Sequence, residues 1–129
     1  MEQPTASGIL VLMLLLQLKH AIGDGPLQTR WMLGEKRRYG ASGGLVHALI
    51  HGVGSLLALL VFGVPAVMSV LLAAADGVTH YHVDYLKEQV VKRQGWTHTD
   101  TYFWWALAAD QTLHHLTYFA MASVIVSAY

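Results

Sequence analysis

Residues 43–62 read GGLVHALIHGVGSLLALLVF, and this stretch decides the fold class. It contains no Lys, Arg, Asp or Glu, and as a helix it is about 30 Å long, the thickness of the hydrocarbon core of a bilayer. It lacks the strict alternation of apolar and polar residues that is typical of a barrel strand, so a helix is the structure that satisfies its backbone in lipid. The stretch also carries His47 and His51, which share one face of such a helix.

The composition agrees with a membrane protein and extends this prediction to the whole chain. Of the 129 residues, 54% are apolar and only 12% are charged, which is about half the charged share of a soluble domain. Residues 23–26 (GDGP) and 63–65 (GVP) separate apolar stretches, because Gly and Pro interrupt helices. We predict one all-α integral membrane domain over residues 1–129, a four-helix bundle with spans at about 8–24, 43–62, 66–90 and 101–128.

The distribution of Lys and Arg predicts the orientation. The two long loops of the four-span arrangement are basic, whereas the chain ends and the turn at residues 63–65 contain no Lys or Arg. The positive-inside rule therefore places both loops in the cytoplasm and both termini on the outer side. A signal peptide is the rival interpretation of residues 8–18, but residues 1–7 lack a basic residue, so we expect a retained helix. The basic loop residues are Arg30, Lys36, Arg37, Arg38, Lys92 and Arg93.

Charge and cysteine content exclude several classes of function. The 8 basic and 8 acidic side chains cancel, and no nucleic-acid-binding module is recognisable, so no nucleic-acid partner is expected. The chain has no Cys, which excludes disulfides and thiolate metal sites. Its 8 His residues are many for so short and apolar a chain, and they need an explanation.

The polar residues of the four spans form pairs that are spaced i, i+4, so both members of a pair lie on one helix face. The apolar stretches that separate the pairs from the outer side are about ten to thirteen residues long, or roughly 15–20 Å in a helix. All four pairs are therefore predicted at one depth, between the bilayer midplane and the cytoplasmic surface. The pairs are His20 and Asp24, His47 and His51, His80 and Asp84, and Asp110 and His114.

Ionisable residues inside a membrane are costly, and they are usually retained where they pair or function. Imidazole and carboxylate ligands without thiolate suit Zn²⁺ first, with Mn²⁺ and Fe²⁺ as alternatives. Eight candidate ligands exceed the four of one tetrahedral ion, so one ion with a second shell or two ions are expected. A metal-free polar network, such as a proton relay, and a His-ligated tetrapyrrole remain as alternatives, although a tetrapyrrole needs no facing carboxylates.

These motifs also carry a family resemblance over roughly residues 10–124. The chain resembles the uncharacterised bacterial and phage membrane proteins grouped as domain-of-unknown-function family 3307. The resemblance implies a location in a bacterial inner membrane and brings no established activity. The chain is also loosely similar to bacterial membrane-bound metal-dependent hydrolases. The matching motifs are His20-x-x-x-Asp24-x-x-x-Gln28, His47-x-x-x-His51, His80-x-x-x-Asp84-x-x-Lys87 and Asp110-Gln111-x-x-His114.

The first functional hypothesis is a metal-dependent hydrolase that acts on a lipid or another amphiphile. The metal would activate water and polarise a phosphoryl or acyl oxygen. We expect Asp110, Lys87 and Gln111 to be the catalytic or substrate-contacting residues, with Gln28 as a second-shell or substrate group. Lys87 is also one turn from Asp84 and is a candidate partner for it. The basic residues 36–38 are expected to attract an anionic head group.

The second hypothesis is non-enzymatic. A metal ion or a polar network would fasten a small accessory subunit of a larger membrane assembly, so other membrane subunits or a second copy of the chain are candidate partners beside the bilayer. Ion transport ranks last, because the outer half of every span is apolar. Four residues are predicted outside the ligand set: His82 and His115 point elsewhere, His98 is solvated, and Lys19 either snorkels or meets Asp76.

Overall fold

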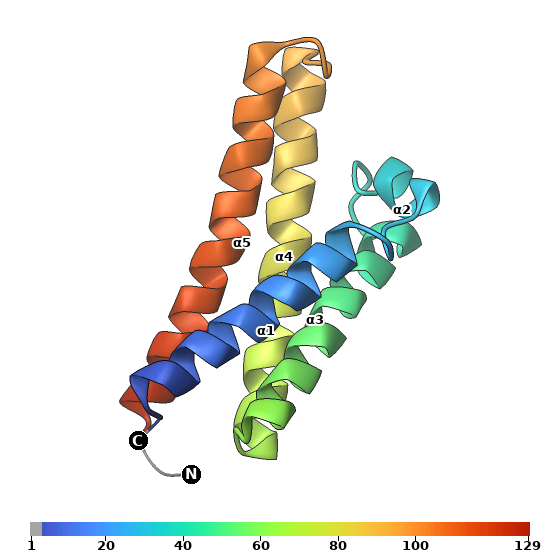
Figure 1. The fold of residues 1–129 in the computed structure, drawn as a ribbon. Helices are drawn as coiled ribbons and strands as arrows, with labels where there is room; N and C mark the ends of the chain where they lie inside the picture. Colours follow the sequence, from blue (N-terminus) through green and yellow to red (C-terminus); the bar gives the residue numbers. More distant parts are fainter. Residues whose placement is uncertain (1–3) are drawn as a thin grey trace.

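The computed structural model describes residues 4–129, which contain helices and no strand (Figure 1). The all-α prediction is confirmed, and the four long helices lie where spans were predicted. The largest difference is the third span, which continues to Gln94 because Gly95, with φ of 68°, forms the C-cap. The helices are α1 (Ala6–Asp24), α2 (Arg30–Glu35), α3 (Ser42–Phe62), α4 (Ala66–Gln94) and α5 (Thr101–Ser127).

The long helices contact one another in a closed ring, in which α1 and α4 each touch both α3 and α5. The first residues of α1 and the last residues of α5 lie at the same end of the molecule (Figure 1). Near this end, apolar side chains fill the ring, among them Leu12, Leu59 and Ile125. At the opposite end, the α4–α5 hairpin projects beyond the end of α1 (Figure 1). The ring therefore has an apolar end and a more polar end.

The first polar loop contains a helix that the sequence did not predict. Thr29 caps α2 by accepting a hydrogen bond from the backbone N–H of Met32, and the Met32 side chain is buried. At the other end of α2, Glu35 accepts a hydrogen bond of 2.6 Å from the backbone N–H of Gly43 at the start of α3. This backbone hydrogen bond holds the pKa of the Glu35 carboxyl below its usual range. Residues 25–41 therefore form a folded cover on α3.

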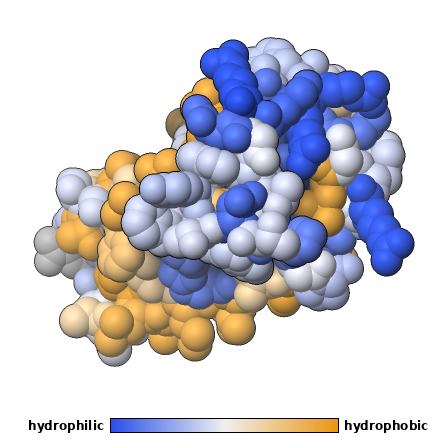
Figure 2. Space-filling view, turned by 90° about the horizontal axis from the view of Figure 1, so that it is seen from above, coloured by the Kyte–Doolittle hydropathy of each residue, from blue (hydrophilic) through white to orange (hydrophobic). Residues whose placement is uncertain are grey.

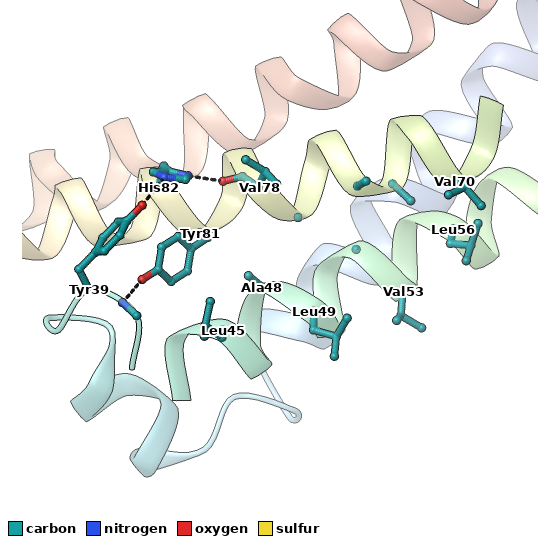
Figure 3. Close-up of a pocket in the computed structure, with 15 residues that line it drawn as sticks. Tyr39, Leu45, Ala48, Leu49, Val53, Leu56, Val70, Val78, Tyr81 and His82 are labelled. Atoms are coloured by element: carbon teal, nitrogen blue, oxygen red, sulfur yellow. Dashed lines mark hydrogen bonds between the residues drawn. The ribbon is translucent and has the colours of Figure 1, made fainter. Parts of the chain in front are cut away.

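Two glycines allow α3 and α4 to approach closely. A Cβ atom at Gly52 would lie 3.3 Å from the carbonyl oxygen of Ala73, and one at Gly77 would lie 3.4 Å from that of Ala48. Small residues at helix contacts are typical of membrane proteins. An apolar groove of about 600 Å³ lies between α3 and α4 on the surface of the helix ring, with Tyr39, Tyr81 and His82 at one end (Figure 3). None of the eight predicted ligands lines this groove.

Two helices, α1 and α3, are long and apolar enough to cross a membrane. Only 22% and 33% of the residues in their most apolar stretches are buried, whereas the core helix of a soluble protein is mostly buried. Exposed side chains such as Leu10, Leu49 and Val61 lie on these helices. Figure 2 looks onto the end that carries α2 and the α4–α5 loop, and it shows hydrophilic residues there and hydrophobic residues along the visible flank.

Candidate metal centre

The structure brings the eight predicted ligands together inside the ring of helices. Each helix contributes one pair because residues i and i+4 share its inward face. All eight residues are buried except Asp24, whose side chain keeps 22% of its exposure. Gly25 and Pro26 end α1 directly after Asp24, so this carboxylate lies at the last turn of the helix. The pairs are His20 and Asp24 of α1, His47 and His51 of α3, His80 and Asp84 of α4, and Asp110 and His114 of α5.

Four of these side chains converge with one atom each. Asp24 Oδ1 lies 3.0 Å from His51 Nε2, 3.2 Å from His47 Nε2 and 3.9 Å from His80 Nε2. The Nε2 atoms of His47 and His80 are 3.0 Å apart. Ligands at 2.0–2.1 Å from a tetrahedral Zn²⁺ are about 3.3 Å apart, so three of these four separations are close to the edges of such a site, whereas the separation of Asp24 Oδ1 and His80 Nε2 is longer. We call Asp24, His47, His51 and His80 the first ligand group.

The unpaired atoms of the first ligand group also fit a cation. Asp24 Oδ1 and both ring nitrogens of His51 are buried, and none of them makes a hydrogen bond. Leaving a buried polar atom unsatisfied costs about 1–3 kcal/mol, and more for a charged one. A single ion between Asp24 Oδ1 and His51 Nε2 would satisfy both atoms.

A second ligand group consists of His80, Asp84 and His114. Asp84 Oδ2 is 3.4 Å from His80 Nε2, and Asp84 Oδ1 is 3.5 Å from His114 Nε2. His114 Nε2 is also 3.3 Å from Asp110 Oδ1, and both of these atoms are buried without a hydrogen bond. The His80 ring stacks on those of His51 and His114 at centroid distances of 3.6 and 4.0 Å. His80 thus belongs to both groups, and its one Nε2 atom can bind a single ion.

A hydrogen-bonded chain orients the Asp24 carboxylate. Gln111 donates from Nε2 to Asp24 Oδ2 at 3.0 Å, so its Oε1 faces His20 Nε2 at 2.9 Å. Because Oε1 can only accept, His20 carries its proton on Nε2, and its Nδ1 accepts from the hydroxyl of Tyr118 at 2.7 Å. These contacts occupy Asp24 Oδ2 and leave Oδ1 for the first ligand group. Both nitrogens of His20 are engaged in this arrangement, which is the usual geometry of a second-shell group.

Lys36 was predicted only as part of the basic loop that attracts an anionic head group, and neither its burial nor its contact with Asp84 was predicted. Its side chain is buried, and Nζ lies 2.8 Å from Asp84 Oδ2. Nζ also donates to Gln28 Oε1 at 2.5 Å, while Gln28 Nε2 donates to the backbone oxygen of Asp24. Gln28 thus contacts the backbone of Asp24 and the side chain of Lys36, and its role as a second-shell or substrate group stays a prediction. The sequence does contain a signal for α2, because the capping residue Thr29 comes shortly before the apolar residues 31–33. It contains no signal that the Lys36 side chain points into the protein.

The remaining polar residues make contacts outside the two ligand groups. Lys87 Nζ lies 2.6 Å from Glu88 Oε1, so Lys87 forms an ion pair with Glu88 rather than with Asp84. Lys19 meets Asp76 at 2.7 Å, as one of the two alternatives predicted, and Ser55 also donates to that carboxylate. Three of the His residues lie apart: His82 binds Tyr39, His98 is exposed, and His115 lies beside His20.

The charges of the carboxylates in the four ligand pairs are not cancelled by the one Lys residue that contacts them. Asp24, Asp84 and Asp110 contribute three negative charges, and Lys36 contributes one positive charge. Imidazoles that act as metal ligands are neutral, so the set carries a net charge of about −2. Uncompensated charge in a buried site is costly, and one divalent cation would neutralise this set.

Comparison of the chain with known proteins identifies its family and no individual relative. The model of a family described as "Protein of unknown function (DUF3307)" matches residues 10–129, which is nearly the whole chain. No curated protein and no solved structure matches the chain. The chain therefore belongs to the DUF3307 family.

Proposed function

We propose that this chain is a multi-pass membrane protein that binds a divalent metal ion inside its helix ring and hydrolyses a lipid or another amphiphile there. The observation that carries the proposal is the convergence of Asp24 Oδ1 with the Nε2 atoms of His47, His51 and His80, together with the missing hydrogen bonds of Asp24 Oδ1 and His51 Nε2. Nitrogen and oxygen donors at tetrahedral separations favour Zn²⁺, with Mn²⁺ or Fe²⁺ as alternatives. The charge of the buried cluster favours one resident ion.

The residues around the ion have separate tasks in this proposal. A bound metal supplies an acidic water and a Lewis acid for a phosphoryl or acyl oxygen. Asp110, whose Oδ1 atom is buried and makes no hydrogen bond, is the candidate general base. Gln111 holds the Asp24 carboxylate through its amide. Lys87, which pairs with Glu88, is the candidate cation for the substrate. The hydrophilic residues at the polar end of the ring favour substrate entry from that end.

The test combines metal content with turnover. Purified wild-type protein is expected to hold about one equivalent of metal and to hydrolyse a mixed lipid extract in a metal-dependent manner. Asp110→Ala is expected to keep most of the metal and to lose turnover by about a hundredfold or more, the usual effect of removing a general base. Wild-type protein without stoichiometric metal would refute the site. Metal without turnover, in protein that co-purifies with other membrane chains, would identify an accessory subunit and refute the hydrolase.

We further propose that α1, α3, α4 and α5 cross the membrane, with residues 25–41 and 95–100 in the cytoplasm. The basic residues of both connections and the apolar exposed faces of α1 and α3 support this orientation. Because the chain has no Cys, single cysteines can report it directly. In intact cells, an impermeant maleimide should label Ser127→Cys, and should label Gly34→Cys and Thr99→Cys only after lysis. The opposite pattern would reverse the orientation, and equal labelling of all three in a soluble fraction would refute membrane insertion.

A further inference from the structure

We propose that Lys36, with Lys87 and Arg37, forms an anion site beside the metal centre that binds the phosphoryl group of the substrate. This inference rests on the proposed metal site and selects a phosphoryl over an acyl substrate. It begins with the burial of the Lys36 side chain, which is 5% exposed, whereas the Arg37 and Arg38 side chains beside it are 53% and 70% exposed. A buried ammonium group is costly unless it is paired, so its position indicates a specific role.

The partner of Lys36 lies beside the first ligand group. Lys36 Nζ is 2.8 Å from Asp84 Oδ2, and the same oxygen is 3.3 Å from His47 Nε2 and 3.4 Å from His80 Nε2. The carboxylate that holds Lys36 therefore borders two imidazoles of the first ligand group, so the ammonium group lies near the proposed ion. An anion bound there would accept a charge-assisted hydrogen bond from Lys36 Nζ.

A second pair of cations lies one helical turn further along α4. Glu88 follows Asp84 by four residues on the same face and accepts from Lys87 Nζ at 2.6 Å and from Arg37 Nε at 2.8 Å. The single negative charge of Glu88 thus pairs with two positive charges, those of Lys87 and Arg37. This group of three side chains has a net charge of +1. With one divalent ion bound, the set of Asp24, Asp84, Asp110 and Lys36 is neutral. The one surplus positive charge is then that of the two cations around Glu88. The whole site then carries a net charge of about +1, which suits a monoanionic phosphodiester better than a neutral acyl ester.

The polar end of the ring gives such a group a route to the ion. The α4–α5 hairpin projects beyond the end of α1, and hydrophilic residues gather at this end of the molecule (Figures 1 and 2). Asp24, at the last turn of α1, is the one member of the first ligand group that is partly exposed. A phosphoryl group that arrives over the end of α1 would therefore approach the ion past the partly exposed side chain of Asp24.

The test measures binding of inorganic phosphate to metal-loaded protein by equilibrium dialysis. Wild-type protein should bind about one equivalent, and metal-free protein should bind at least about tenfold more weakly. Lys36→Met should also bind about tenfold or more weakly while it keeps its metal, because a charge-assisted contact is lost. The matched control is Arg30→Met, which removes an exposed cation from the same segment of residues 25–41, and it should bind as the wild type does.

The outcomes separate this inference from the proposed function. Wild-type protein without metal refutes the proposed function, whereas metal-loaded Lys36→Met that binds phosphate within twofold of wild type overturns the anion site alone. If Lys36→Met loses its metal, Lys87→Met decides, because it should keep metal and bind phosphate more weakly, and unchanged binding overturns the site. Displacement of phosphate by phosphatidate in nanodiscs would identify a lipid head group as the source. Displacement by glycerol phosphate alone would identify a soluble phosphoester.

Discussion

His47→Ala is expected to empty the metal centre. His47 Nε2 lies within 3.3 Å of Asp24 Oδ1, Asp84 Oδ2 and His80 Nε2, so its imidazole is in contact with both ligand groups. Loss of a second-shell partner typically costs 10–100-fold in metal affinity, and loss of a direct ligand should exceed about a hundredfold. Elemental analysis of protein purified without chelator should find about one equivalent of metal in wild type and none in His47→Ala.

Thermal unfolding supplies an independent readout of the same change. A ligand present at a thousand times its dissociation constant stabilises the folded state by about 4 kcal/mol, so a chelator should lower the melting temperature of the wild type. The chelator should have no effect on His47→Ala. The matched control is His82→Ala, since His82 is exposed, binds Tyr39 and the Val78 carbonyl, and lies outside both ligand groups. Full metal content in His47→Ala would contradict the assignment.

The sequence was sufficient to predict the four long helices and the inward faces of the four pairs. Both depend on local rules, because apolar length predicts a helix and i, i+4 spacing places two side chains on one face. The ends of the helices were also nearly correct where Gly or Pro ends a helix, as Gly25 and Pro26 do after Asp24. Residues 30–35 were predicted as loop because six residues carry too weak a periodic signal.

The sequence could not predict how the pairs divide into ligands and supporting groups. His20 and Asp110 have the same spacing to their pair partners as His80 has, yet neither belongs to a ligand group. The difference comes from Gln111 and Tyr118, which engage both nitrogens of His20 across the α1–α5 contact. The predicted ligand roles of His20 and Asp110 stay predictions, and the contacts of His20 favour a supporting role for it. Such contacts depend on tertiary packing, which no spacing rule contains.

The same limit explains why the burial of Lys36 was not predicted. A run of three basic residues is normally exposed, and two of the three are exposed here. Lys36 is buried because α2 turns the chain back onto α3, which brings its Nζ atom to Asp84 and Gln28. Its contact with Asp84 therefore depends on a helix that the composition did not indicate.

Gly23→Ala is expected to weaken metal binding without removing any ligand. A Cβ atom at Gly23 would lie 2.6 Å from His51 Nε2 and 2.7 Å from His51 Cε1, which is closer than atoms in folded proteins approach. The His51 ring cannot move away freely, because it is fully buried and stacks on His80 at a centroid distance of 3.6 Å. The substitution should therefore displace His51 Nε2 from the first ligand group and lower metal affinity by about 10–100-fold.

The same overlap should also lower the melting temperature of the metal-free protein. Ala is a better helix former than Gly by up to about 1 kcal/mol, but this gain does not offset the displacement of a fully buried ring. Gly34→Ala is the matched control, because a Cβ atom there has no neighbour within 4 Å, and it should leave metal affinity unchanged. Metal titrations of the two variants give the comparison. Wild-type affinity in Gly23→Ala would mean that His51 Nε2 is not a ligand, and the first ligand group would then lose its most closely placed imidazole.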